Sequence, residues 1–228
     1  MKIKILYEDT DILAVDKPSG ILVHPAAEQP RNGAGPDKKT IIDIFKKKYP
    51  KMEVAHRLDR ETSGVLLLAK NKKAYEFLKK QFQGRTIKKT YVAIVSGSVK
   101  NDRGIINKPI GRSPVDFRRY SAGRGARGKM REAITQYRVL GKFEDKKGNK
   151  FTYLEIHPKT GRTHQIRVHM KYLNHPVVCD SLYNPNNPCP KGLKRMALHA
   201  KSIEFQNLKG EVVKVESLVP AELKKVVK

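Results

Sequence analysis

The chain has 228 residues and a formal net charge of +26, from 48 basic and 22 acidic side chains. This length suffices for one sizeable core or two closely joined subdomains, and no apolar run approaches the ~18 residues that a membrane span needs. The charge indicates a polyanionic partner, because each Lys or Arg placed on a phosphate displaces a condensed counterion, although a lysine-rich surface shared by a whole proteome is an alternative.

Hydrophobic patterning predicts many strands and few helices. Short apolar or alternating runs bounded by turn residues predict strands at 3–7, 11–15, 65–69, 87–96, 132–140, 150–157, 201–206 and 211–217. Capping residues and helical spacing predict helices from Thr40 to about Tyr49, after Asn71, over 163–173 and after Pro220. Residues 26–38 are rich in Pro and Gly and are expected to form a loop. This pattern indicates an α+β fold with a mixed, largely antiparallel sheet.

The stretch from His56 to Lys70 places an acid, Asp59, between Arg57 and Arg60 and ahead of the apolar run 65–69. A carboxylate on a loop that leads into a buried strand is held on rigid scaffold, as a catalytic group must be. The alternative is an ordinary loop aspartate that caps a turn or pairs with a flanking arginine.

The segment from Arg112 to Arg131 holds seven basic residues and one acid, with aromatic residues and glycines between them. Arginines grip phosphate and stack on bases, and aromatic rings offer stacking faces. We predict an RNA-binding loop that is mobile until RNA binds, unless it is only a solvated basic surface. Its contacting residues are Arg112, Arg118, Arg119, Arg124 and Arg127.

The remaining potential ligands do not form a metal-binding pattern. His164 and His169 are five residues apart, so on a helix they point in different directions, and HExxH spacing is absent. Cys179 and Cys189, the only cysteines, have neither CxxC nor zinc spacing, which predicts two free thiols in a reducing cytosol. The N-terminus reads as strand and not as a signal peptide, so a cytoplasmic location is expected.

His56-Arg57-Leu58-Asp59, followed by Thr62-Ser63-Gly64, resembles the signature of the RluA-type RNA pseudouridine synthases. Further stretches resemble that family in order along nearly the whole chain: Asp16 to Gly20 with His24-Pro25, Lys89 to Ala93 with Gly97, Lys108 to Arg112, Thr160 to His169, and Ala197 to Ala200. One departure is Cys179, where the family usually has glycine. A second is the start of the chain, which leaves no room for the S4-type RNA-binding domain that many relatives carry.

The resemblance implies a single pseudouridine synthase catalytic domain over residues 1–228, with a central sheet split by a cleft into two subdomains and helices outside. It implies isomerisation of specific uridines in ribosomal or transfer RNA. The reaction breaks the N1–C1′ bond, rotates the uracil and joins C5 to C1′. It has no redox step and no leaving group, so no cofactor or metal is expected.

The resemblance also implies the roles of the site residues. Asp59 is the catalytic carboxylate, and Arg167 forms a salt bridge to it that keeps it ionised. Tyr91 stacks on the uracil and can move a proton. The expected substrate-binding residues are His56, Arg57, Arg60 and Arg162, the arginines contacting phosphates or filling the space of the flipped base, with Ile166 or Leu198 as an apolar wall unless these two are ordinary core.

RNA is the expected partner, with neither a membrane nor an obligate protein partner, so a monomer is expected. Two other function classes stay open. A non-catalytic RNA-binding protein would share the charge and the basic segment, but gains nothing from a desolvated Asp59. A nuclease or glycosidase would be expected to show a metal cluster or a second carboxylate.

Overall fold

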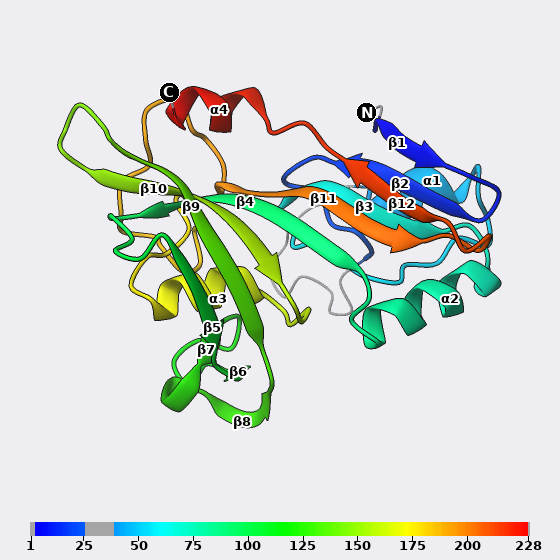
Figure 1. The fold of residues 1–228 in the computed structure, drawn as a ribbon, viewed down its shortest axis with the longest axis horizontal. Coiled ribbons are helices and arrows are strands. Elements are labelled where there is room, and N and C mark those ends of the chain that lie inside the picture. The colour runs from blue at the N-terminus through cyan, green and yellow to red at the C-terminus, as the bar shows by residue number, and fades with distance from the viewer. Residues whose placement is uncertain (1–2, 26–38, 228) are drawn as a thin grey trace. The chain divides into compact units, whose positions relative to one another are not determined.

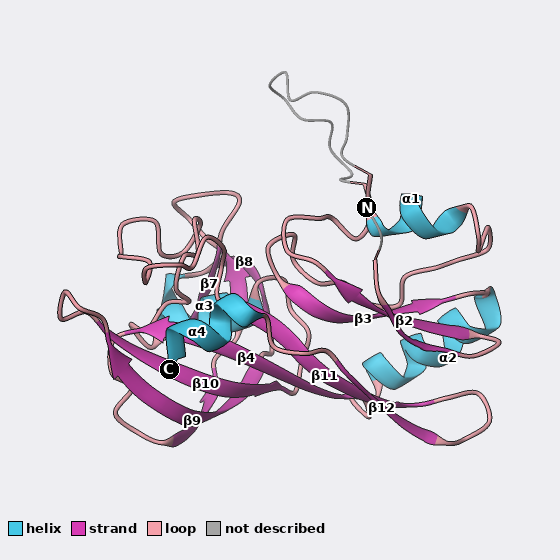
Figure 2. Cartoon of the chain, turned by 90° about the horizontal axis from the view of Figure 1, so that it is seen from above, coloured by secondary structure: helices cyan, strands magenta, loops and turns pink. Residues whose placement is uncertain are grey.

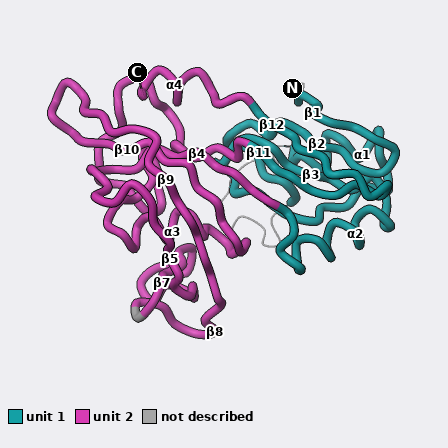
Figure 3. Tube along the Cα trace, viewed as in Figure 1, with its two compact units in different colours: residues 1–87, 202–217 teal, residues 88–201, 218–228 magenta. Residues whose placement is uncertain are grey.

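The computed structural model describes residues 3–25 and 39–227, apart from the side chain of Arg124. The loop predicted at 26–38 therefore lies outside the described residues. The chain divides into two compact units (Figure 3). Unit 1 contains residues 1–87 and 202–217, and unit 2 contains residues 88–201 and 218–228.

Unit 1 is built on antiparallel strands. Strands β1 (Ile5–Glu8), β2 (Ile12–Lys17) and β3 (Ser63–Ala69) pair in that order (Figure 1). Strand β12 (Val212–Glu216) pairs with the second half of β11 (Leu198–Gln206), which begins in unit 2 and ends in unit 1. Every residue of β3 is buried, which confirms its reading as a core strand.

The two helices of unit 1 begin at the predicted capping residues. Helix α1 (Ile41–Lys46) has a capping box: the Thr40 hydroxyl accepts from the Asp43 backbone N–H, and the Asp43 carboxylate accepts from that of Thr40. Helix α2 (Lys72–Gln83) begins where Asn71 accepts from the Ala74 N–H. Its buried face, with Ala74, belongs to the same apolar cluster as β2 and β3.

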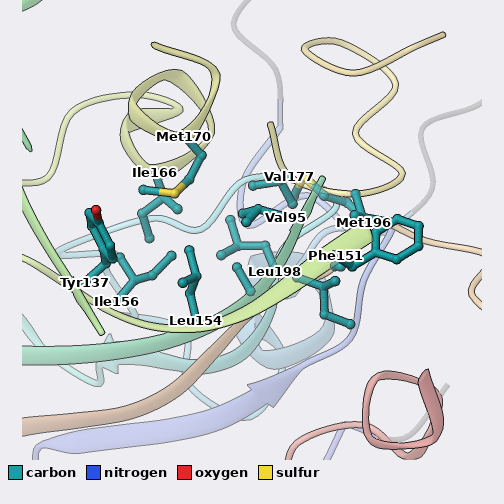
Figure 4. Packing of buried hydrophobic residues seen from close by; sticks show 14 of the residues in the cluster. Val95, Tyr137, Phe151, Leu154, Ile156, Ile166, Met170, Val177, Met196 and Leu198 are labelled. Atoms are coloured by element: carbon teal, nitrogen blue, oxygen red, sulfur yellow. The ribbon is translucent and has the colours of Figure 1, made fainter. Parts of the chain in front are cut away.

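Unit 2 contains a second antiparallel set of strands, in the order β4 (Lys88–Ser96), β10 (Lys150–Pro158), β9 (Ile134–Glu144) and β5 (Arg103–Asn107). Helices α3 (Gln165–Tyr172) and α4 (Ala221–Val227) contribute to its core. Figure 4 shows Ile166 and Met170 of α3 packed with residues of β9 and β10 such as Tyr137 and Ile156.

The basic segment of unit 2 contains strands, so the prediction of a loop was wrong, whereas its mobility before RNA binding stays a prediction. Strands β6 (Ile110–Arg112), β7 (Tyr120–Ala122) and β8 (Arg127–Arg131) form a small antiparallel sheet with β6 in the middle, and a 3₁₀ turn (Gly123–Gly125) follows β7. The sheet has its own apolar anchor, in which Ile110 and Ala122 pack with Val168 and Tyr183. Composition did not reveal these strands, because their anchor joins Ile110 and Ala122 to Val168 and Tyr183, which lie far along the chain.

The α+β class is confirmed, and strands dominate over helices (Figure 2). The predicted strands correspond to observed strands with shifted ends, whereas β5 to β8 were not predicted. Within residues 3–25 and 39–227, no helix is long and apolar enough to cross a membrane.

The cysteine prediction was also wrong, because Cys179 and Cys189 form a disulfide with 5.4 Å between their Cα atoms. The turns between them bring the two residues together, and no spacing rule signals such a closure. Cys179 lies in the left-handed region, at φ 55°. Glycine adopts that conformation without strain. This explains physically why glycine is usual at this position in the family that the sequence resembles.

Candidate active site

Asp59 lies half-buried on the turn that enters β3. Its backbone carbonyl accepts from the Thr62 N–H at 3.1 Å, which closes the turn. Leu58 before the turn is 5 % exposed and Thr62 after it is 2 % exposed. Asp59 therefore lies between two buried residues, and its backbone has little freedom to move.

Lys17, at the end of β2, holds this turn through hydrogen bonds. Its side chain is fully buried, and its ammonium donates to the backbone carbonyls of Pro18, Ile21 and Arg60 at 2.9, 2.8 and 2.9 Å. An ammonium has three N–H donors, so these three acceptors match its capacity. One of these acceptors is the carbonyl of Arg60, the residue that directly follows Asp59 in the sequence.

The neighbours of Lys17 reinforce the same contact. The Gly20 N–H donates to the Arg60 carbonyl at 2.8 Å, and the Ser19 hydroxyl donates to the Glu61 carbonyl at 2.7 Å. Gly20 has a φ of 88°, so the tight turn favours glycine there. Lys17 was not among the predicted site residues, although the Asp16 to Gly20 stretch was the signal that could have found it.

His56 anchors the entry to the turn. The Leu67 backbone N–H donates to His56 Nε2 at 2.9 Å, so this nitrogen is unprotonated. The imidazole ring also packs on Phe82 of α2, with centroids 4.6 Å apart. These contacts favour a supporting role for His56, and its predicted contact with substrate stays a prediction.

The two arginines beside Asp59 are exposed. Arg60 Nε donates to the Gly20 carbonyl at 3.2 Å, which ties its side chain to the same turn. Burial and the nearby charge of Arg57 lower the pKa of His24. Both arginines are exposed beside Asp59, and their predicted contact with RNA phosphates stays a prediction.

Arg167 on α3 is almost fully buried and belongs to unit 2. Its Nε and Nη2 donate to the two carboxylate oxygens of Asp180 at 2.6 and 2.7 Å, and its guanidinium lies 5.0 Å over the ring of Tyr183. This bidentate pairing fixes the plane of the guanidinium. The predicted salt bridge to Asp59 joins residues of different units and stays a prediction.

Asp180 is a second residue that the sequence analysis missed. It is 1 % exposed, and besides Arg167 it accepts from the backbone N–H groups of Leu182 and Tyr183, both at 3.0 Å. The one signal in the sequence was an acid that directly follows the apolar run ending at Val178 and Cys179.

The stretch from Thr160 to His169 holds α3 in place. Gln165 uses its whole amide: Oε1 accepts from Thr160 Oγ1 and the Arg162 N–H, and Nε2 donates to the Ile134 carbonyl and Thr135 Oγ1. His169 Nε2 lies 3.0 Å from the Lys108 carbonyl, which can only accept, so Nε2 carries the proton. Burial lowers the pKa of His169.

The other predicted residues of unit 2 lie on or next to its core. Tyr91 is half-buried on β4 opposite Ile156 and packs against the core cluster. Ile166 and Leu198 are 6 % and 3 % exposed within that cluster, which favours the alternative that they are ordinary core. Arg162 is half-buried, and its Nε donates to the Glu132 carbonyl at 2.8 Å.

Lys89, two residues before Tyr91, has a perturbed acidity. Its ammonium donates to the Thr160 carbonyl at 3.1 Å, and burial lowers its pKa to about 8. It therefore loses its charge near neutral pH more readily than a surface lysine does. Lys89 was not among the predicted site residues.

The predicted RNA-binding arginines differ in their surroundings. Arg118 and Arg119 both pair with Asp116, at 2.9 and 3.4 Å, and the hydrogen bond from Arg118 lowers the pKa of Asp116 to about 2. Arg112 lies over the ring of Tyr120 at 4.8 Å, and Arg127 is exposed. The side chain of Arg124 lies outside the described part of the chain. Within the described residues, His, Cys, Asp and Glu side chains form no group of three that could hold a metal ion.

The chain matches known proteins over most of its length. A family model described as RNA pseudouridylate synthase matches residues 11–172. The chain is 36 % identical over 228 residues to the "Uncharacterized RNA pseudouridine synthase YlyB" of Bacillus subtilis, with 98 % of this chain and 71 % of the relative covered. It is 36 % identical over 235 residues to the "Ribosomal large subunit pseudouridine synthase D" of Xanthomonas campestris pv. campestris, with 98 % and 68 % covered.

Solved structures give the same result. The fold is similar to "Human RNA Pseudouridylate Synthase Domain Containing 1", with a TM-score of 0.77 and 27 % identity over 95 % of this chain and 83 % of that chain. "Human RNA Pseudouridylate Synthase Domain Containing 4" has a TM-score of 0.72 and 24 % identity over 96 % of this chain and 90 % of that chain, and shows the fold alone.

The contacts of Lys17 generate a stability prediction. Lys17→Met keeps much of the buried volume but removes the Lys17 donor from the Pro18 and Ile21 carbonyls and one of the two donors of the Arg60 carbonyl, so we expect the free energy of unfolding to fall by about 3 kcal/mol. Urea denaturation measures this. Lys4→Met, at an exposed position one strand away, is the control and should change the free energy by less than about 0.5 kcal/mol. Equal stability of both variants would contradict the assigned contact.

Proposed function

Because the chain belongs to the RNA pseudouridylate synthase family, we propose that Asp59 carries out the uridine-to-pseudouridine isomerisation of this RNA-modifying enzyme, without a cofactor. The family match over residues 11–172 contains Asp59, Tyr91 and Arg167. The observation that carries the proposal is the fixed turn of Asp59, which is closed by Thr62 and held through Arg60 by buried Lys17.

The reaction balances without an added reactant. The bond between uracil N1 and ribose C1′ breaks, and the uracil rotates. A bond then forms between C5 and C1′, after which C5 loses its hydrogen as a proton and N1 is protonated. A carboxylate that attacks the sugar or the base, or that stabilises an oxocarbenium-like state, meets the requirement. Water must stay away from C1′, since it would hydrolyse the intermediate.

Arg167 is proposed to keep Asp59 ionised and correctly aimed. A guanidinium has five N–H donors, and the two bonds to Asp180 use only two of them. Since Asp180 fixes the guanidinium plane, the remaining donors point in defined directions. An arginine held in this way can orient a second carboxylate without the entropy cost of a mobile side chain.

Tyr91 is proposed to stack on the uracil after the uridine has left its helix. Flipping a base costs a few kcal/mol, which contacts to the flanking phosphates offset. Arg57, Arg60 and Arg162 are proposed to make those contacts, and the protein is proposed to act as a monomer.

The substrate is proposed to be structured ribosomal RNA, with transfer RNA as the alternative to be tested beside it. The name of the relative from Xanthomonas campestris refers to the large ribosomal subunit, which supports this order. A non-catalytic RNA-binding protein is the less favoured function, because a surface that only binds RNA has no use for an acid held rigidly among arginines.

Asp59→Asn is expected to lower the rate of pseudouridine formation by about 10³-fold or more, while RNA affinity stays within a few-fold, because the carboxylate acts in the reaction and the basic residues supply the binding. Release of tritium from C5 of labelled uridine measures the rate, on ribosomal and on transfer RNA transcripts. Asp102→Asn, at an exposed position, is the matched control. Substantial turnover by the Asp59 variant would remove this residue from the mechanism.

Asp180→Asn tests the orientation of Arg167. We expect kcat to fall by about 10- to 100-fold with KM nearly unchanged, because asparagine keeps an acceptor for Leu182 and Tyr183 but loses the charge and one acceptor for Arg167. The acidic limb of the rate profile should move to higher pH, since a poorly aimed Arg167 stabilises the ionised acid less. A lower melting temperature with an unchanged pH profile would indicate a purely structural role.

Activity is expected to survive exhaustive EDTA treatment without added nucleotide, because the isomerisation has no redox or group-transfer step. Tritium release before and after treatment measures this. Recovery of a lost activity by zinc alone would indicate a metal enzyme. Recovery by magnesium alone must be compared with RNA refolded in magnesium beforehand, because RNA folding also requires it.

A further inference from the structure

A pocket of about 280 Å³ lies in unit 2 beside the small sheet. Strands β6, β7 and β8 form part of its wall, and the Gly161 to Thr163 turn ahead of α3 forms the rest. Four cationic side chains line it: Arg112, Lys129, Arg131 and Arg162.

None of these four cations has a carboxylate partner within the described residues. Arg112 donates to the Phe117 carbonyl at 3.1 Å and Arg162 donates to the Glu132 carbonyl at 2.8 Å, contacts that orient the guanidinium groups but leave their charge uncompensated. This contrasts with Arg118 and Arg119, which share Asp116. Four positive charges around one pocket repel one another. An anion bound there relieves this repulsion, so its binding is favourable.

The strands that form the pocket wall are closely packed. Gly111 is buried, and a Cβ at this position would lie 2.6 Å from Met130 Sδ and 2.9 Å from the Arg127 carbonyl, so a side chain does not fit. Gly161, on the opposite segment, contributes backbone without a side chain. Gly111 therefore lets β8 pack closely against β6, which places Lys129 and Arg131 beside Arg112 at the pocket.

One face of the Tyr120 ring is covered by a cation. Arg112 lies over it at 4.8 Å, and the edge-to-face contact with His164 holds the ring, with centroids 5.9 Å apart. The ring therefore orients the Arg112 guanidinium. This arrangement favours a charged ligand over a stacked one.

We propose that this pocket binds one backbone phosphate of the RNA. The inference rests on the proposed function, because it takes RNA as the ligand. Arg112, Lys129 and Arg131 are exposed, so the pocket opens to solvent and a continuous polynucleotide can pass over it. Arginine at such a site can bind two phosphate oxygens at once, which fixes the register of the strand.

The first test replaces the two pocket residues on β8 whose side chains are exposed. Lys129→Ala/Arg131→Ala is expected to weaken binding of a ribosomal RNA fragment at least about tenfold and to reduce the salt slope of binding by about one unit, the value for one lost phosphate contact. The control, Lys146→Ala/Lys147→Ala, removes the same charge from exposed positions on the turn between β9 and β10. Equal weakening by both variants would contradict the proposed phosphate site and indicate that RNA is attracted only by the overall positive charge.

The second test neutralises RNA phosphates one at a time with methylphosphonate. One position is expected to weaken binding to the wild type about tenfold and to have a much smaller effect on Lys129→Ala/Arg131→Ala, since two of the four cations are already absent there. Additive effects at every position would overturn the proposal, as would binding of inorganic phosphate to the pocket without any such coupling to RNA.

Tritium release is measured with the same RNA and separates the two proposals. Coupling between the variant and one phosphate, without pseudouridine formation by the wild type, would leave the pocket standing and refute the proposed function. Pseudouridine formation without that coupling would refute the pocket alone.

Discussion

The geometry around Asp59 depends on one buried cation, the ammonium of Lys17. Burying an ammonium is costly unless each of its N–H groups finds an acceptor. Here three backbone carbonyls supply them, and one belongs to Arg60, the residue after Asp59. The cost of burial thereby makes the turn rigid, because any displacement of Arg60 would leave both an ammonium donor and a carbonyl without a partner.

The second unit uses the same principle with different chemistry. Arg167 is buried with its guanidinium on Asp180 and over Tyr183. A paired buried arginine is costly to disturb, since removal of one partner leaves an uncompensated charge. In unit 1 the buried Lys17 ammonium holds the turn of Asp59, and in unit 2 the buried ion pair with Asp180 holds Arg167. Exposed surface charges alone would not position either group, because exposed pairs contribute little.

The sequence predicted those features that local pattern controls. The all-apolar run of β3 and the caps of α1 and α2 at Thr40 and Asn71 were found because each depends on adjacent residues. The small sheet was missed because its anchor joins Ile110 to Val168 and Tyr183, far along the chain. Lys17 and Asp180 were missed for the same reason: a lysine after a strand and an acid after an apolar run gain their meaning only through Arg60 and Arg167.

The basic residues also differ in whether the fold gives them a partner, which local sequence does not reveal. The sequence treats every arginine between Arg112 and Arg131 as one more positive charge, yet Arg118 and Arg119 are held by Asp116, whereas Arg112 and Arg131 face a pocket without a carboxylate partner in the described chain. Net charge therefore sets the long-range attraction of RNA, which salt screens. The register of the bound strand must come from the few cations whose charge the fold leaves uncompensated at a fixed place, because only these gain more from one phosphate position than from the next.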